Sequence, residues 1–180
     1  MTTPNIITTL RLPLQAITLF LLLIHNSLTS YALILYSINI LLDKVDGILA
    51  RKNNQVTDFG KYYDIATDRA IQITTLLTIN HILQGSLIIP IILIISRDFL
   101  LTGIRQFSAN KNLFLKGSKF GKTKAIFEML GIYSGLIYLL SPSQIILNLN
   151  ITTIYLSIAI GFFRLYKNIK DNYSLIIKNL

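Results

Sequence analysis

The apolar segments of this chain are the feature that most limits how it can fold. Six of them follow one another along the 180 residues, at 13–24, 31–46, 62–83, 87–107, 125–141 and 144–163. A helix that crosses a bilayer needs about 20 apolar residues, within a range of about 17–25. The first segment can extend back to Thr8 and the second to Leu28. The pattern therefore predicts six membrane-crossing helices.

Composition favours the same class of protein. Hydrophobic residues make up 52% of the chain and charged residues only 14%, whereas a soluble domain has about 25% charged residues. The chain has too little charge to cover a surface in water. We expect an all-α polytopic membrane protein with a single domain over residues 1–180. The absence of cysteine excludes disulfides and cysteine metal sites.

Lys and Arg are distributed unevenly over the polar connections. Residues 25–30, 81–86 and 141–144 contain none, whereas 44–61, 105–124 and 164–178 contain many. Basic residues favour the cytoplasmic side of a membrane, so this alternation predicts six crossings with both termini in the cytoplasm. Arg11, which precedes the first apolar segment, agrees with that orientation.

The net charge of +9 bears on the partners of the chain. Nucleic-acid binding proteins carry such an excess on a soluble face, but here the basic residues lie beside apolar segments. We therefore expect membrane lipids with anionic head groups, or substrates that carry phosphate, and no nucleic acid.

Four of the eight acidic residues fall within 26 positions: Asp43, Asp46, Asp64 and Asp68. Each pair has a spacing of three or four, which places both members on one helix face. An Asp at membrane depth costs about 2.5–3.5 kcal/mol, so four together need a compensating charge. Carboxylate oxygens suit Mg²⁺ or Mn²⁺, and two such ions can neutralise a pyrophosphate during an in-line displacement.

The alternative is a solvated loop in which these aspartates pair with nearby cations, namely Lys44, Arg51, Lys61 and Arg69. The residues between the aspartates favour a ligand site instead. Small residues allow a flat ligand to approach the backbone, and a guanidinium offers a planar fork for phosphate oxygens. Residues of these kinds are Gly47, Ala50, Gly60 and Arg51.

This stretch resembles the signature of the CDP-alcohol phosphatidyltransferase family, D-x2-D-G-x2-A-R-x8-G-x3-D-x3-D, at every fixed position. The resemblance implies a six-helix membrane fold, a homodimer, a polar cavity open to the cytoplasm, and CDP-diacylglycerol as donor. It also implies roles by position. Two metal ions would be held by Asp43, Asp46, Asp64 and Asp68, and Asp68 would also be the general base. CDP-diacylglycerol would contact Asp46, Gly47, Ala50, Arg51 and Gly60.

Residues 4–11, 96–105 and 120–124 resemble the members of this family that use glycerol 3-phosphate as acceptor. Arg97 and Arg105 are eight residues apart and share a helix face, and a bound phosphate would give Arg97 a partner inside an apolar segment. Lys122 and Lys124 would close the same pocket. The alternatives are snorkelling of these side chains to the cytoplasmic surface and a surface pair between Arg97 and Asp98.

Other functions stay open on the sequence alone. Glycerol-3-phosphate members commonly carry D-P-x-A-D-K across the third and fourth acids, whereas Ile65 and Arg69 stand at the Pro and Lys positions here. The acceptor could instead be serine, an inositol phosphate or phosphatidylglycerol. A divalent-cation-binding membrane protein without catalysis and an inactive scaffold are further alternatives, and the intact signature favours an enzyme. We expect it in a bacterial plasma (inner) membrane.

Overall fold

The computed structural model describes residues 3–24, 26–52, 57–110 and 119–171, and its regular elements are all helical. A short 3-10 helix, Asn26–Leu28, joins the first two α-helices. The six α-helices are α1 (Thr3–Ile24), α2 (Thr29–Lys52), α3 (Asp58–Ile82), α4 (Ile88–Asn110), α5 (Lys119–Leu140) and α6 (Gln144–Asp171). For these residues the prediction of an all-α chain with six long helices is confirmed.

Most of the helices are longer than the apolar segments that predict them. The extra residues lie next to the basic connections, as where α2 continues to Lys52 and α5 begins at Lys119. The described residues of the predicted connections 44–61 and 105–124 are therefore helical except for Thr57, which corrects the sequence interpretation. A helix can continue beyond its apolar stretch because Lys and Arg are good helix formers. Basic residues in the last turn, such as Arg51 and Lys52 in α2, also complement the helix dipole.

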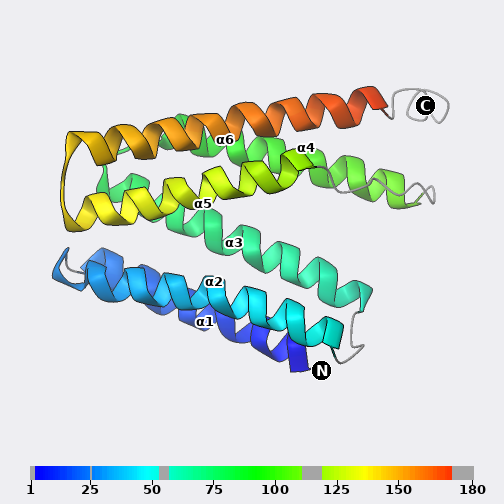
Figure 1. Ribbon diagram of the computed structural model, residues 1–180, viewed down its shortest axis with the longest axis horizontal. Coiled ribbons are helices and arrows are strands. Elements are labelled where there is room, and N and C mark those ends of the chain that lie inside the picture. Colours follow the sequence, from blue (N-terminus) through cyan, green and yellow to red (C-terminus); the bar gives the residue numbers. More distant parts are fainter. Residues whose placement is uncertain (1–2, 25, 53–56, 111–118, 172–180) are drawn as a thin grey trace.

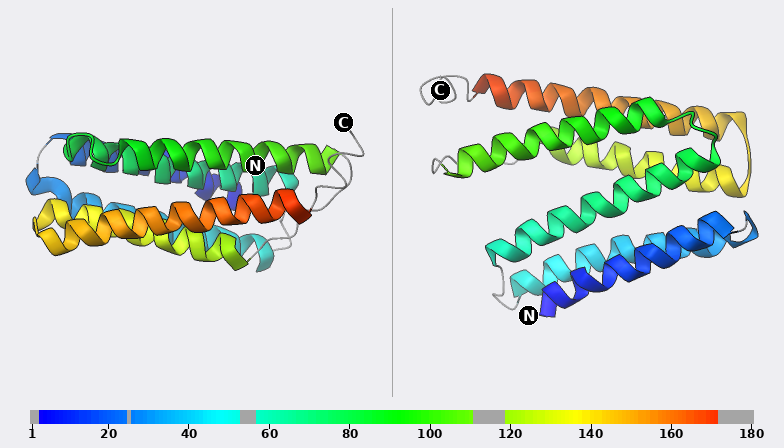
Figure 2. Two further views of the ribbon diagram at one scale, coloured as in Figure 1. Left: turned by 90° about the horizontal axis from the view of Figure 1, so that it is seen from above. Right: turned by 180° about the vertical axis from the view of Figure 1, so that it is seen from behind.

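Consecutive helices run in opposite directions (Figure 1). One end of the molecule carries the start of α1, the end of α6, and the helix ends next to the basic connections, and the two further views agree (Figure 2). We call this the basic end. The connections without Lys or Arg lie at the other end. The alternating charge of the sequence thus becomes a molecule with two chemically different ends.

Helices α1 and α2 form one close pair and α5 and α6 another, with α3 in contact with members of both (Figure 1). Glycines allow the second pair to approach closely. A Cβ at Gly131 would lie 2.7 Å from Ile154, and one at Gly135 would lie 2.9 Å from Asn150. Small residues four apart serve this purpose in membrane helices, where backbone proximity replaces hydrophobic segregation.

The outside of the bundle is apolar and much of its inside is polar. Large apolar side chains such as Phe20, Phe99 and Ile145 are exposed, whereas Arg11 and Glu128 are buried. Within the described residues, three helices contain stretches long and apolar enough to cross a membrane: Asn5–Ile24, Phe120–Leu140 and Gln144–Lys170. The other three helices, α2, α3 and α4, carry the four signature aspartates together with Arg69, Arg97 and Asp98.

Candidate functional site

The signature aspartates lie on two neighbouring helices, in the halves of α2 and α3 that are nearer the basic end. Asp43 and Asp46 are in the second half of α2, and Asp64 and Asp68 in the first half of α3. Carboxylate oxygens of Asp43, Asp46 and Asp64 all lie within 4.8 Å of one another. Such a set of oxygen ligands fits a hard divalent cation. All four aspartates are on helices, so the solvated-loop alternative does not describe them.

Arg11 supplies a counter-charge for this acidic cluster. Its Nη1 atom lies 2.6 Å from Oδ1 of Asp43 and 3.2 Å from Oδ1 of Asp64, and its Nη2 atom lies 3.6 Å from Oδ1 of Asp68. The side chain is only 1% exposed. We expected Arg11 ahead of the first helix, as an indicator of topology. It lies within α1 instead, because that helix begins at Thr3.

Residues of α1 and α2 hold this arrangement in place. The side chain of Asn39 accepts a hydrogen bond from Nε of Arg11 at 3.1 Å and donates one to the backbone oxygen of Arg11 at 3.0 Å. Thr8, one turn before Arg11, donates to Oδ2 of Asp46 at 2.8 Å. The first helix therefore fixes the acidic residues of the second.

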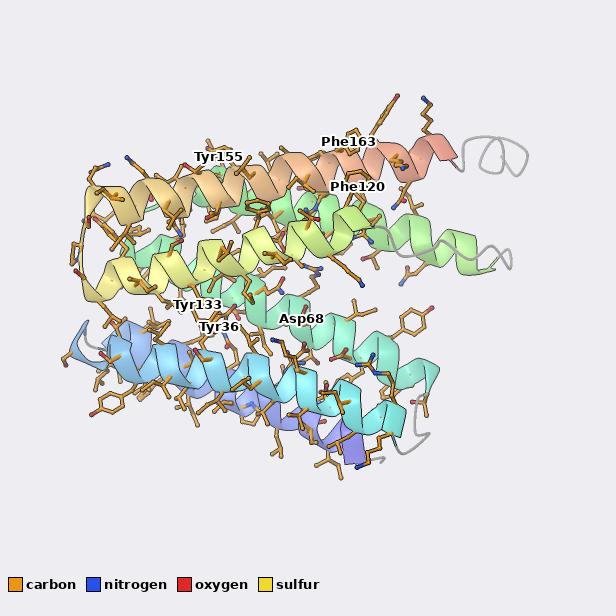
Figure 3. All side chains as sticks on the ribbon, in the orientation of Figure 1. Tyr36, Asp68, Phe120, Tyr133, Tyr155 and Phe163 are labelled. Carbon is orange, nitrogen blue, oxygen red and sulfur yellow. The ribbon has the colours of Figure 1, made fainter. Side chains whose placement is uncertain are left out.

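Asp68 lies on α3 in the middle of the structure (Figure 3). Its Oδ2 atom accepts a hydrogen bond from Gln72 at 3.2 Å, and Gln72 in turn accepts one from Nη1 of Arg69 at 2.8 Å. Gln72 thus joins the acidic cluster to a second group of charges, which lies between α3, α4 and α5.

This second group, which we call the buried charge cluster, consists of Arg69, Arg97, Asp98, Lys124 and Glu128. Glu128 is its centre, because its carboxylate lies 3.0 Å from Arg97, 3.1 Å from Arg69 and 2.5 Å from Lys124. Asp98 contacts the same three cations at 2.7 to 3.5 Å. Three cations face two carboxylates, so the cluster has an excess of one positive charge.

Arg97 is buried, at 2% exposed, and does not snorkel to the surface. Both of its carboxylate contacts are made through Nη2. The Nε and Nη1 atoms are buried without a hydrogen-bond partner among the described residues. Gly161 of α6 makes room for the guanidinium, because a Cβ there would lie 1.8 Å from Nη1. The pair with Asp98, which the sequence offered as an alternative at the surface, exists in the interior instead.

The other basic residues expected at the acceptor site are placed differently. Lys124 belongs to the buried charge cluster, whereas Lys122 is exposed on α5, since residues two apart on a helix do not share a face. Arg105 belongs to α4, and its side chain is outside the part of the chain that the structure describes.

The expected donor-binding residues lie at the facing ends of α2 and α3. Asp46 is buried, Ala50 is half-buried, and Arg51 is exposed and donates to the backbone oxygen of Gly47 at 2.9 Å. Packing also favours glycine at position 60. A Cβ at that position would lie 2.9 Å from side-chain oxygens of both Asn5 and Thr57, the N-cap residue of α3.

A cavity of about 330 Å³ separates the acidic cluster from α5, within the usual size of ligand pockets. Tyr36 packs edge-to-face against Tyr133 at 5.6 Å, on the side of Asp68 away from the basic end (Figure 3). The cavity is lined by Arg11, Tyr36, Ile40, Asp43, Lys44, Asp68, Ile71, Gln72, Ala125, Ile126 and Met129.

Sequence reasoning gave no site role to Arg11, Asn39, Gln72 or Glu128, although each had a signal in the sequence. Arg11 and Glu128, the only glutamate of the chain, are charged residues next to or within apolar segments, where ionisable groups usually serve a function. Asn39 is four residues before Asp43, and Gln72 is four residues after Asp68. That spacing places each amide on the same helix face as the aspartate.

Comparison with known proteins identifies similar sequences over most of the chain. The model of the family described as CDP-alcohol phosphatidyltransferase matches residues 1–163. A CDP-diacylglycerol–glycerol-3-phosphate 3-phosphatidyltransferase of Rickettsia typhi is 32% identical over 155 residues, which cover 80% of this chain and 85% of that protein. A protein of the same name from Wigglesworthia glossinidia brevipalpis is 32% identical over 140 residues, covering 76% of this chain and 75% of the relative.

Proposed function

The chain belongs to the CDP-alcohol phosphatidyltransferase family, and on this premise we propose that it transfers the phosphatidyl group of CDP-diacylglycerol to sn-glycerol 3-phosphate. The products are phosphatidylglycerophosphate and CMP. Its relatives from Rickettsia and Wigglesworthia carry the name of that activity. The observation that carries the proposal is the gathering of the four signature aspartates around Arg11, beside a cavity.

The acidic cluster is suited to divalent cations, which Asp43, Asp46, Asp64 and Asp68 would hold. Two Mg²⁺ or Mn²⁺ ions there would neutralise the pyrophosphate of the donor. Asp46, Gly47, Ala50, Arg51 and Gly60 would border the cytidine diphosphate part. Arg51 is exposed near Gly47, so its planar fork can turn from the backbone to phosphate oxygens.

Asp68 is the proposed general base. Gln72 fixes one of its carboxylate oxygens, and the residue lines the cavity in which the acceptor would lie. Asp68 takes the proton of the 1-hydroxyl of glycerol 3-phosphate, and that oxygen attacks the phosphorus that bears diacylglycerol. The bond to the CMP oxygen breaks and CMP leaves. Since no Ser, Cys or His is arranged as an activated nucleophile among the described residues, we favour a single displacement.

The buried charge cluster is suited to the phosphate of the acceptor. Its excess positive charge and the unpartnered Nε and Nη1 atoms of Arg97 support this assignment. Lys124 belongs to the proposed subsite, and we add Arg69, whose side chain is 30% exposed and which connects to Asp68 through Gln72. Arg105 and Lys122 remain proposed members of the acceptor site from the sequence.

Replacing Lys124 by Gln is expected to raise the KM for glycerol 3-phosphate about tenfold or more, because one charge-assisted hydrogen bond contributes about 1.5–3 kcal/mol. The substitution leaves two cations facing two carboxylates, so the cluster loses its excess charge without leaving an unpaired acid. The KM for CDP-diacylglycerol should stay within about twofold. Steady-state kinetics of CMP release measures both constants.

Lys170→Gln is the control at the same end of the molecule. It removes the same charge at an exposed position in the last turn of α6, outside the proposed acceptor site, and its KM for glycerol 3-phosphate should stay close to that of the wild type. Equal changes in the two variants would mean that Lys124 acts through the overall charge of the basic end. A change in the donor KM alone would assign Lys124 to the nucleotide instead.

Family membership and the three long apolar helices make the chain an integral membrane protein. Beyond that, we propose that all six helices cross the membrane. Each has 22–28 residues, or roughly 33–42 Å at 1.5 Å per residue. The proposed orientation puts the basic end and both termini in the cytoplasm of a bacterium, in its plasma (inner) membrane. The homodimer that the resemblance implies is retained as part of the proposal.

A further inference from the structure

We propose that Arg11 is a resident counter-cation of the acidic cluster, which stays in place when divalent ions bind and lowers the affinity of the site for them. The inference rests on the proposed function in one respect, namely that the cluster binds such ions. It assigns to an arginine of the first helix a role that lies outside the aspartate signature.

The position of the guanidinium is the first argument. A single nitrogen, Nη1, lies between carboxylates that belong to different helices, at 2.6 Å from Asp43 and 3.2 Å from Asp64. Those two carboxylates, with Asp46, are also the described residues whose oxygens come within 4.8 Å of one another. Arg11 therefore contacts two of the three acids best placed to share a cation.

The second argument is that Arg11 cannot easily leave. Asn39 forms hydrogen bonds with both the Nε atom and the backbone oxygen of Arg11. The side chain of Arg11, which belongs to α1, is almost completely buried. An arginine keeps its charge at any physiological pH, and a buried charge without a partner is strongly destabilising. Asn39 thus holds the guanidinium at its Nε atom, and its Nη atoms face the carboxylates.

Two consequences follow from a cation fixed at this place. In the absence of metal, Arg11 offsets part of the repulsion among the carboxylates through its contacts with Asp43, Asp64 and Asp68, so the cluster is assembled before an ion arrives. When an ion binds, the positive charge of Arg11 repels it, and the affinity is lower than four carboxylates alone would give. Weaker binding would allow metal and CMP to exchange after each turnover.

The experiment compares wild type, Arg11→Gln and Arg11→Lys, each purified in detergent, by titration with Mn²⁺ while the electron paramagnetic resonance signal of free Mn²⁺ is recorded. Arg11→Gln should lower the Kd for Mn²⁺ at least about tenfold, whereas Arg11→Lys should stay within about threefold of wild type. In EDTA the Tm of Arg11→Gln should fall below that of wild type, and saturating Mn²⁺ should remove most of the difference.

An unchanged or higher Kd in Arg11→Gln would overturn the inference, as would an equal loss of Tm with and without Mn²⁺, which indicates a packing role only. If Arg11→Gln does not fold, Asn39→Ala decides. This variant keeps the charge but frees the guanidinium, and it should lower the Kd about threefold, while an unchanged Kd contradicts the proposal.

The outcome can be separated from that of the proposed function. A wild-type protein that binds Mn²⁺ with the predicted effect of Arg11, yet releases no CMP with any acceptor, would support the inference and defeat the proposed activity. A wild type and an Arg11→Gln variant that both fail to bind Mn²⁺ would overturn the inference.

Discussion

Replacing Asp68 by Asn is expected to lower the rate of CMP release by about 10²–10⁴-fold, the usual contribution of a positioned general base. An amide has almost the same shape as the carboxylate and can still accept the hydrogen bond that Gln72 donates, but it cannot take a proton from the acceptor. The loss should therefore appear in kcat, with little change in the KM for CDP-diacylglycerol. Steady-state CMP release with Mg²⁺ and glycerol 3-phosphate measures both.

Two further measurements separate a lost base from a lost metal site. Asp68 is outside the group of three carboxylates whose oxygens lie within 4.8 Å, so Asp68→Asn should bind Mn²⁺ within about tenfold of wild type. Asp68→Glu, which retains a base on a longer side chain, should recover part of the rate. Near-normal turnover by Asp68→Asn would show that another group removes the proton.

Replacing Glu128 by Gln is expected to have the largest effect on stability, about 3–5 kcal/mol, because removing one partner of a buried ion pair leaves uncompensated charge. Three cations lose one of their two carboxylates, and Glu128 is only 2% exposed, within a helix apolar enough to cross a membrane. The expected result is a much lower Tm in detergent, measured from the amount of monodisperse protein after heating.

Leu130→Ala serves as the comparison for Glu128→Gln. Leu130 is on the same helix and 45% exposed, so its truncation should change the Tm little. A double variant of Glu128→Gln with Lys124→Gln should regain part of the lost stability, because two cations then face one carboxylate and the excess positive charge returns from two to the wild-type value of one. A Tm for Glu128→Gln equal to that of Leu130→Ala would mean that Asp98 and solvent suffice for all three cations.

The fold could largely be predicted from the sequence, because the apolar segments and the alternation of basic connections are visible in short stretches of the chain and determine where helices form. Six helices were expected and six are described, in the expected order. The helix ends were less predictable. Residues 47–52 and 119–124 lie outside the predicted apolar segments, yet they are helical, since a helix satisfies its own backbone hydrogen bonds whatever the hydropathy of its side chains.

The acidic residues of the site could be found because their spacing of three and four residues encodes a shared helix face. Their pairing with Arg11 could not, because Arg11 reaches them from a different helix, across 32 to 57 positions of sequence. The same holds for Glu128, which meets Arg97 and Arg69 only through the packing of α3, α4 and α5. Sequence spacing shows which residues share a helix face, and tertiary contacts decide which faces meet.

The central claim is the transfer of a phosphatidyl group to glycerol 3-phosphate at the acidic cluster, and CMP release by purified protein in detergent tests it most directly. CDP-diacylglycerol is supplied with Mg²⁺ or Mn²⁺, and each acceptor is offered separately. We predict release that depends on glycerol 3-phosphate and is lost in Asp64→Asn. Release with serine, an inositol phosphate or phosphatidylglycerol instead would contradict the proposed acceptor. Folded protein that releases no CMP with any acceptor would contradict the enzymatic function itself.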